Sequence, residues 1–356
     1  MTRSRSKDII AILTRALEVK ASDILIAGGE RVVYKVNGRW RREAMWEPLT
    51  DSEAAGLILG MLAATGSGAE IDAKFPKDLD FSFSLPGGER FRVNVYRIQG
   101  RMAAVLRPIP SAPPQLEELG LPLPPVERAL KGKQGLILVT GATGSGKSTT
   151  LAAMIEWLNT REEIHIVTIE DPIEFFFQPK RAVISQREVG TDTESFASAL
   201  RSALRQAPNV IMVGEMRDLE TIQAAITAAE TGHLVMATLH TRSAPEAVTR
   251  IIDVFPEGYR ELVRLQLSSA LSLVISQTLL PNREETGRVL AYEILVNTPA
   301  ISNLIRENKI GQIGNAMFTG QKEGMITMAQ CVEELIRKGL ISPKTAEAVR
   351  GAPKEV

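Results

Sequence analysis

A glycine-rich stretch, Gly141–Ser148, places the strongest constraint on how this chain can fold, because its sequence G-A-T-G-S-G-K-S fits the pattern G-x-x-x-x-G-K-[ST]. It directly follows the apolar run 136–139 and precedes apolar residues at helical spacing over 151–158. A strand, a glycine turn and a helix start suit phosphate binding: glycines let backbone N–H groups point inward, and the helix N-terminus adds partial positive charge. The stretch therefore predicts a nucleotide-binding loop, or P-loop.

Two side chains of the P-loop have expected roles with ATP and Mg²⁺. Lys147 would reach the β- and γ-phosphates, and the Ser148 hydroxyl would sit on Mg²⁺. A glycine-rich turn without a ligand is the alternative, and the flanking strand and helix argue against it. The residues predicted to bind the nucleotide are Gly141, Ala142, Thr143, Gly144, Ser145, Gly146, Lys147, Ser148 and Thr149.

The composition favours two globular domains, and its balanced charges produce no strong overall electrostatic field. The chain has 356 residues, and its 42 Lys and Arg balance its 42 Asp and Glu, so a nucleic acid or an anionic membrane would need a local basic patch. Cys331 is the single cysteine, which excludes an internal disulfide and a cysteine-built zinc site. The sequence shows no signal peptide and no apolar run of about 18 residues, so we expect a cytoplasmic protein and only peripheral contact with any membrane.

The N-terminal part of the chain predicts a small α+β domain with an antiparallel sheet. Helical spacing marks 8–19, and hairpins are expected over 32–42 and 79–95. The first hairpin would turn at Asn37-Gly38, a preferred pair for a type I′ turn. Seven of the 19 prolines then lie between Pro108 and Pro125, which favours an extended linker. The predicted division is a domain at 1–107, a linker at 108–125 and a second domain at 126–356.

The second domain alternates strands with helices, which predicts an α/β fold with a parallel sheet and helices on both faces. Expected strands lie at 136–140, 164–169, 210–213 and 234–238, and helices lie near 195–206 and from Lys147 and Leu219. Beyond Ala244 the pattern is mainly helical. The helices expected there lie near 244–253, 258–278, 299–307, 324–338 and 343–350.

Two glutamates follow predicted strands of this sheet. Glu215 lies two residues after the strand 210–213. Because Gly214 takes the usual aspartate position, Glu215 is the candidate to orient the attacking water. Glu170 ends the strand 164–169 and could complete the Mg²⁺ shell through water. Solvated glutamates at strand ends are the alternative for both residues.

A histidine and several arginines complete the candidate site. His240, at the exit of its strand, can face the γ-phosphate or act as a hydrogen-bonded structural histidine, and no third ligand nearby suggests zinc. Arginines that neutralise transition-state charge often come from another domain or subunit. The candidates are Arg92, Arg107, Arg201 and Arg205, with an ordinary surface charge as the alternative for each.

These motifs together resemble the secretion-ATPase superfamily of type II secretion and type IV pili. The most specific segments are 169–174 (I-E-D-P-I-E), 213–221 (V-G-E-M-R-D-L-E-T), 227–234 and 238–241. The resemblance implies a hexameric ring of subunits with a PAS-like N-terminal domain and a RecA-like ATPase domain. It also implies that Arg92 and Arg107, which match family arginines, close onto the nucleotide.

Within this superfamily the chain looks most like the pilus retraction ATPases. It lacks the tetracysteine zinc motif of assembly and secretion ATPases, and Ala300–Glu307 reads A-I-S-N-L-I-R-E where retraction ATPases carry A-I-R-N-L-I-R-E. The resemblance implies an ATP-hydrolysing motor for pilus retraction and twitching motility that works on a membrane platform protein. A paralogous ATPase is a further expected partner, and Ser302, in place of the first arginine, leaves an accessory motor open.

Three other functions remain as alternatives. An assembly or type II secretion ATPase would share the chemistry with the opposite mechanical output. A RecA-like DNA translocase is disfavoured by the neutral charge balance and by only 5% aromatic residues, since single-strand channels combine positive charge with stacking platforms. We therefore expect no nucleic-acid partner. A nucleotide-dependent scaffold without turnover is disfavoured because Lys147, Ser148 and Glu215 are all present.

Overall fold

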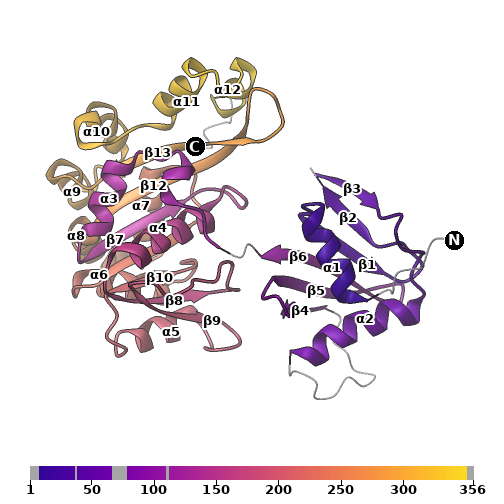
Figure 1. The fold of residues 1–356 in the computed structure, drawn as a ribbon. Helices are drawn as coiled ribbons and strands as arrows, with labels where there is room; N and C mark the ends of the chain where they lie inside the picture. The colour runs from indigo at the N-terminus through magenta and orange to yellow at the C-terminus, as the bar shows by residue number, and fades with distance from the viewer. Residues whose placement is uncertain (1–7, 37, 66–77, 110–111, 351–356) are drawn as a thin grey trace. The chain divides into compact units, whose positions relative to one another are not determined.

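The computed structural model describes residues 8–36, 38–65, 78–109 and 112–350. The chain forms two compact units, Met1–Ala112 and Pro113–Val356 (Figure 1). Each unit has its own hydrophobic core, and the two are described separately. No helix among the described residues is long and apolar enough to cross a membrane.

The N-terminal unit is an antiparallel sheet with two helices against one face; the sequence predicts the sheet and the first helix, whereas the second helix was not among the expected elements. The strand order is β3-β2-β1-β6-β5-β4. Apolar residues of both helices, such as Ile12 and Ile58, share a core with Phe91 and Leu106 from the sheet. The elements are α1 (Ile9–Glu18), β1 (Asp23–Ala27), β2 (Val33–Val36), β3 (Arg39–Arg42), α2 (Asp51–Ala64), β4 (Asp78–Ser84), β5 (Arg90–Ile98) and β6 (Arg101–Ile109).

Both predicted hairpins of this unit form. β2 pairs with β3, although Asn37 of the expected turn lies outside the described residues. β4 pairs with β5, which places Phe83 opposite Phe91 in the core. On the neighbouring pair, Arg92 of β5 lies opposite Arg107 of β6.

The described parts of the proline-rich segment, 108–109 and 112–125, contain regular secondary structure. β6 runs to Ile109, and Pro108 lies opposite Phe91 of β5, beyond Leu106, the last residue of β6 that pairs with β1. A short 3-10 helix, η1 (Leu116–Leu119), and helix α3 (Leu123–Lys131) follow. Prolines in the first turn of α3 leave no hydrogen bond unmade, since the first N–H groups of a helix have no partner in it.

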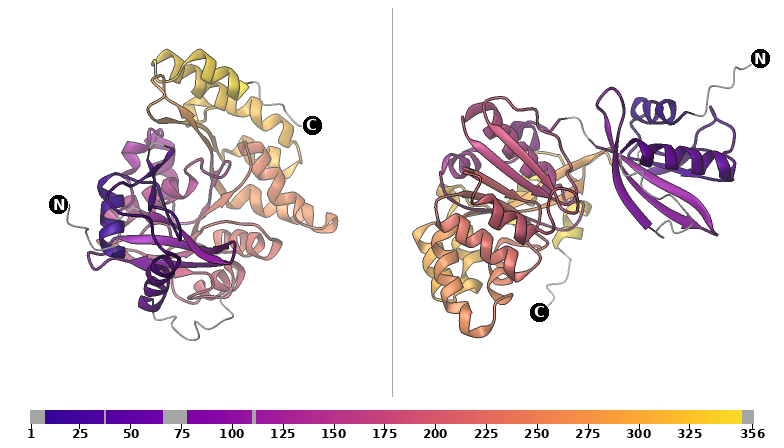
Figure 2. Two further views of the ribbon diagram at one scale, coloured as in Figure 1. Left: turned by 90° about the vertical axis from the view of Figure 1, so that its right-hand side faces the viewer. Right: turned by 90° about the horizontal axis from the view of Figure 1, so that it is seen from below.

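The C-terminal unit is a seven-stranded sheet in the order β13-β12-β7-β11-β10-β8-β9, parallel except for β13. Its helices lie on both faces (Figures 1 and 2). α3 and α4 pack on one face, and α5 to α8 pack on the other. The predicted α/β fold class is therefore confirmed. The remaining elements are β7 (Gly135–Thr140), α4 (Lys147–Arg161), β8 (His165–Glu170), β9 (Val183–Glu188), α5 (Phe196–Ala203), β10 (Val210–Val213), α6 (Leu219–Glu230), β11 (Leu234–Leu239), α7 (Ala244–Asp253), α8 (Arg260–Ala270), β12 (Leu271–Pro281), β13 (Arg288–Val296), α9 (Pro299–Arg306), α10 (Ile313–Thr319), α11 (Met328–Arg337) and α12 (Pro343–Arg350).

One predicted helix is wrong in its second half. The helix expected over 258–278 ends at Ala270, and β12 begins at Leu271. The apolar run there, with Leu273, Val274 and Ile275, is buried in the sheet beside β7. A short buried run of this kind fits a strand or a helix by periodicity alone, and the neighbouring strand decides the outcome.

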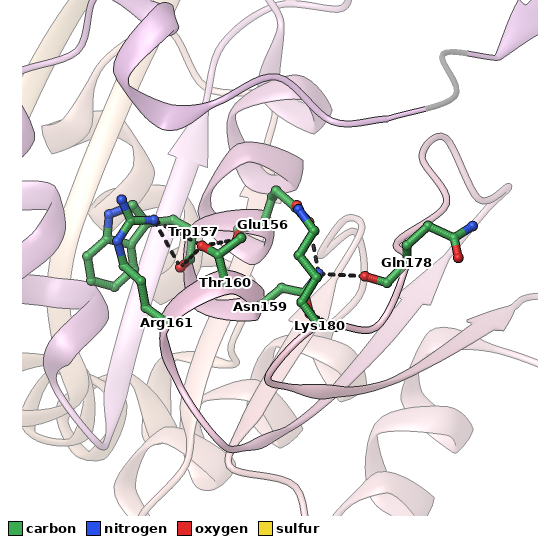
Figure 3. A network of polar contacts seen from close by, with 7 residues as sticks. All are labelled: Glu156, Trp157, Asn159, Thr160, Arg161, Gln178 and Lys180. Atoms are coloured by element: carbon green, nitrogen blue, oxygen red, sulfur yellow. Dashed lines mark hydrogen bonds and ion pairs between the residues drawn. The ribbon is translucent and has the colours of Figure 1, made fainter.

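Helix α4 also fixes the loop between β8 and β9 (Figure 3). Asn159 is fully buried, its Nδ2 donates to the Gln178 carbonyl oxygen at 2.9 Å, and its Oδ1 accepts from the Lys180 N–H at 3.0 Å. The Glu156 carboxylate accepts from Asn159 Nδ2 and forms an ion pair with Lys180 Nζ. The loop that leaves Glu170 is therefore attached to the helix that leaves the P-loop.

Candidate functional site

Four neighbouring parallel strands bring the predicted site residues of the C-terminal unit to one edge of the sheet. The P-loop follows β7, Glu170 ends β8, Glu215 follows β10, and His240 follows β11. These strands lie side by side in the order β7-β11-β10-β8. Because they run in the same direction, their carboxyl ends share one edge, where open α/β sheets bind ligands.

The P-loop has the backbone of a phosphate cradle. Gly141, Gly144 and Gly146 have φ values of +144°, +79° and +90°, which side chains other than glycine rarely adopt. A Cβ at Gly141 would lie 2.3 Å from the Gln277 carbonyl oxygen and 2.6 Å from Ser145 Oγ, so no other residue fits there. The buried Ser145 Oγ has no hydrogen-bond partner within the protein. An unsatisfied buried hydroxyl in a glycine-built loop fits a site that takes a polar ligand.

Lys147 begins α4 and lies folded over the P-loop. Its Nζ donates to the carbonyl oxygens of Gly141 at 2.8 Å and Ala142 at 3.1 Å. Burial lowers the pKa of the Lys147 ammonium group, and the charges of Glu215 and Glu174 act in the opposite direction. The ammonium group is therefore held by two neutral acceptors, which anionic phosphate oxygens can replace with stronger charge-assisted hydrogen bonds.

Gln277 of β12 contacts the P-loop and the first turn of α4, and no sequence pattern indicated this contact. Its Nε2 donates to the Ser145 carbonyl oxygen at 2.8 Å, and its Oε1 accepts from Thr150 Oγ1 at 2.9 Å. The residue is 2% exposed. Because 258–278 was expected to be one helix, no pattern placed this side chain beside the P-loop.

Glu215 is partnered at both carboxylate oxygens. Arg217 Nη2 lies 2.7 Å from its Oε1, and His240 Nε2 lies 3.4 Å from its Oε2. The Glu215 side chain is 14% exposed, whereas that of Arg217 is 73% exposed. His240 thus contacts the proposed water-orienting residue, a relationship that the sequence did not predict, and Arg217 was missed altogether.

Gly214, at the usual aspartate position before Glu215, lies close to the end of β8. A Cβ at this position would lie 3.2 Å from the Ile169 carbonyl oxygen, which is tighter than nine in ten real contacts of a Cβ. Its N–H donates to the same carbonyl oxygen at 2.8 Å, and its own carbonyl oxygen accepts from Thr238 Oγ1 at 2.5 Å. The glycine lets the ends of β8, β10 and β11 approach closely.

Glu170 is a buried carboxyl group with several donors. Thr168 Oγ1 donates to its Oε1 at 2.7 Å, and the Glu174 N–H donates to its Oε2 at 3.3 Å. Gln186 Nε2 also reaches Oε1, at 3.3 Å. Burial raises the pKa of Glu170 to about 6, although these hydrogen bonds favour the charged form.

The oxygen donors at this edge fit Mg²⁺. Mg²⁺ prefers oxygen ligands and is commonly held by one or two carboxylates together with substrate phosphates and water. Ser148, the second residue of α4, supplies a hydroxyl oxygen. Both Glu170 oxygens already accept hydrogen bonds from the protein, which suits a contact through water. In the described part of the chain, no three His, Cys, Asp or Glu side chains cluster as a metal site.

The candidate arginines are all engaged in ion pairs or hydrogen bonds. Arg107 of the N-terminal unit contacts Oδ1 of the buried Asp23 through Nε at 3.0 Å and Nη2 at 2.7 Å. Arg92 lies 3.8 Å from Asp80. In the C-terminal unit, Arg201 pairs with Glu220 at 3.1 Å, and Arg205 donates to the Arg201 carbonyl oxygen at 3.5 Å. The roles of Arg92 and Arg107 at the nucleotide stay predictions.

Comparison with known proteins places this site in a family. The family described as "Type II/IV secretion system protein" matches residues 3–344. The type IV pilus retractation ATPase PilT of Pseudomonas aeruginosa is 46% identical over 98% of this chain and 99% of its own. The "Twitching motility protein" of Neisseria gonorrhoeae is 55% identical over 76% of this chain and 72% of its own.

A solved structure shows the same fold. The crystal structure of the pilus retraction motor PilT with bound ADP superposes with a TM-score of 0.88, at 44% identity over 98% of both chains. The predicted resemblance is thereby confirmed along nearly the whole chain. This chain belongs to the type II/IV secretion system protein family.

Proposed function

We propose that this protein is an ATP-hydrolysing motor that drives type IV pilus retraction and twitching motility. The observation that carries the proposal is the set of Lys147, Glu170, Glu215 and His240 at one sheet edge beside a glycine-built cradle. Full-length similarity to the Pseudomonas aeruginosa PilT, and to a PilT whose crystal structure holds ADP, supports the same ligand and the same mechanical output for this chain.

The proposed reaction is in-line attack of water on the γ-phosphorus of ATP. The bond from the γ-phosphorus to the oxygen that bridges the β- and γ-phosphates breaks, which yields ADP and inorganic phosphate. Lys147 leaves the carbonyl oxygens of Gly141 and Ala142 and bonds the phosphate oxygens. Glu215 orients the water and accepts its proton, which requires an oxygen that Arg217 or His240 now contacts.

The other residues of the site have supporting roles in this proposal. Mg²⁺, when bound, neutralises charge on the β- and γ-phosphates. Ser148 would hold it directly and Glu170 through water. His240, which contacts Glu215, would report on the γ-phosphate. Arg92 and Arg107, from the domain assigned to 1–107, would add positive charge when that domain closes over the linker 108–125 onto the ATPase domain 126–356.

The test of the chemistry is Glu215→Gln in the full-length protein. The variant should bind ATP with an affinity near that of the parent and hydrolyse it at least about 100-fold more slowly, since a general base contributes on the order of 10²–10⁴ in rate. Glu220→Gln, an exposed glutamate on α6, is the matched control. Unchanged turnover in Glu215→Gln would remove this residue from the mechanism.

The proposed assembly is a homo-hexamer at the cytoplasmic face of the inner membrane. It would act on the pilus platform protein, with a paralogous ATPase as a further partner, and the resemblance to retraction ATPases is the ground for each of these partners. Deleting the gene in its own host separates the outputs: hyperpiliated cells that cannot twitch support retraction. Cells without pili would support an assembly ATPase.

Ser302 favours a second candidate, an accessory retraction motor. It stands where retraction ATPases carry arginine, and its side chain is half-buried beside α8. If the protein is accessory, its deletion should weaken twitching without abolishing it. Loss of twitching in the deletion strain, restored by the parent gene alone, would argue for the principal motor.

A further inference from the structure

We infer that Gln277 is a positioning residue that aims the Gly146 N–H group into the phosphate cradle. The inference deepens the proposed function, because it rests on nucleotide binding at the P-loop. Gln277 lies on β12, far from the P-loop in sequence, and it belongs to none of the recognised motifs.

The contacts of Gln277 fix the orientation of its amide. The Ser145 carbonyl oxygen can only accept a hydrogen bond, so the Nε2 group must face it, at 2.8 Å. Oε1 then faces Thr150 Oγ1, which donates to it at 2.9 Å. A rotated amide would set two oxygens against each other in a buried site, where an unpaired polar group costs most.

The geometry of the peptide bond turns this contact into a constraint on the cradle. In a trans peptide the C=O of one residue and the N–H of the next point in opposite directions within one rigid plane. Gln277 holds the Ser145 carbonyl oxygen toward β12, so the Gly146 N–H points to the other side of the loop. A P-loop binds phosphate through such inward N–H groups.

The surroundings of Gln277 make this support rigid. A Cβ at Gly146 would lie 3.3 Å from Nε2, and one at Gly141 would lie 2.3 Å from the Gln277 carbonyl oxygen. β12 is itself held between β7 and β13, and the neighbouring Ser276 Oγ donates to the Arg242 carbonyl oxygen at 2.8 Å. The absence of a side chain at Gly146 therefore leaves room for the Gln277 amide, and at Gly141 it leaves room for the Gln277 backbone.

Loss of the Nε2 donor should weaken phosphate binding specifically. Without it the Ser145–Gly146 peptide can rotate, which turns the N–H away from the anion or the carbonyl oxygen toward it. A hydrogen bond to a charged group changes affinity by at least about tenfold, so a loss of that size in ADP affinity is expected. Adenosine, which has no phosphate, should bind with unchanged affinity.

The experiment compares three full-length variants with the parent protein. Gln277→Met has a similar length and no donor, and Gln277→Glu keeps an acceptor for Thr150 but sets an oxygen against the Ser145 carbonyl. Thr150→Val is the matched control, because it removes the other hydrogen bond of the same amide. ADP binding is measured with a fluorescent ADP analogue, adenosine binding by competition, and folding by the ligand-free Tm.

We expect the dissociation constant for ADP to rise at least about tenfold in both Gln277 variants and less than about threefold in Thr150→Val. Gln277→Met carries the test if Gln277→Glu does not fold. ADP affinity within twofold of the parent in Gln277→Met, an equal loss in Thr150→Val, or an equal loss for adenosine would overturn the inference. A parent protein that does not bind ADP would refute the proposed function itself.

Discussion

Arg217 Nη2 lies 2.7 Å from Oε1 of Glu215, so the residue proposed to orient water is paired with a cation. The Arg217 side chain is 73% exposed, and ion pairs with such exposed partners are worth about 0.2–1 kcal/mol. We predict that Arg217→Gln raises basal ATP turnover by up to about fivefold, because Oε1 becomes free for water. A phosphate-release assay on the purified protein measures this.

The control for Arg217→Gln is Arg181→Gln, which removes an exposed arginine paired with Glu163 away from the site. Its turnover should equal that of the parent. A clear fall in turnover for Arg217→Gln would show instead that Arg217 holds Glu215 in its working orientation.

The recognised motifs let the sequence predict the carboxyl edge of the sheet. Strand ends such as Glu170 and Glu215 follow apolar runs, and parallel strands always bring their ends to one edge. The sequence could not predict which side chains contact one another. Arg217 is two residues from Glu215, a spacing with no periodic signature, and Gln277 reaches the P-loop only because β12 pairs with β7.

The sequence also could not predict which acidic residues near the site are buried. Three acids in 170–174 suggested a solvated loop as strongly as a metal site. Glu170 is buried because β9 adds Gln186 beside it, and β9 was not among the expected strands. Its neighbour Glu174 is exposed. Partners from a distant strand, which no local pattern contains, thus decide which acid of the loop is buried.

Glu170 should make the stability of the ligand-free protein depend on pH. Burial raises its folded pKa to about 6 from an ordinary value of 4.5, so its protonated form is favoured in the fold. This contribution is complete below about pH 4.5 and is lost as the pH rises through 6. The loss amounts to about 2 kcal/mol.

We therefore predict that the unfolding free energy of Glu170→Gln minus that of the parent rises by about 2 kcal/mol from pH 4.5 to pH 7.5. The rise comes from the parent, which loses this contribution over that range. Urea unfolding at both pH values in metal-free buffer measures it. Glu162→Gln, an exposed carboxylate at the end of α4, should show no such gain. A Glu170→Gln protein whose stability follows that of the parent across this range would contradict the prediction.

Asn159 should be one of the more important polar residues for stability in the ATPase unit. It is fully buried and bonds both the Gln178 carbonyl oxygen and the Lys180 N–H (Figure 3). Asn159→Ala leaves these backbone groups unpaired, which should cost about 2–4 kcal/mol of unfolding free energy. Thr160→Ala is the control, because the Thr160 hydroxyl contacts only its own helix: it donates to carbonyl oxygens of α4 and accepts from Arg161 Nη1. A similar Tm for both variants would contradict this account.

Ser302 hydrogen-bonds the C-terminal end of α8, where an arginine would place a charge. Its hydroxyl donates to the Ser268 carbonyl oxygen, one of the last carbonyls of α8, which also accepts from Asn297 Nδ2 at 3.0 Å. Because Asn297 keeps its hydrogen bond, Ser302→Ala should cost only about 0.5–1.5 kcal/mol of unfolding free energy.

Ser302→Arg forces a long side chain into the half-buried space between α8 and α9, which should cost about 1–3 kcal/mol. Urea unfolding of both variants tests the order, and complementation of the deletion strain tests the consequence. We expect the parent gene to restore twitching and Ser302→Arg to restore no more than the parent. The contrary result is a Ser302→Arg protein as stable as the parent whose cells twitch faster than cells with the parent gene. It would show that this position is a surface for a partner, because an arginine that fits without strain must point into solvent.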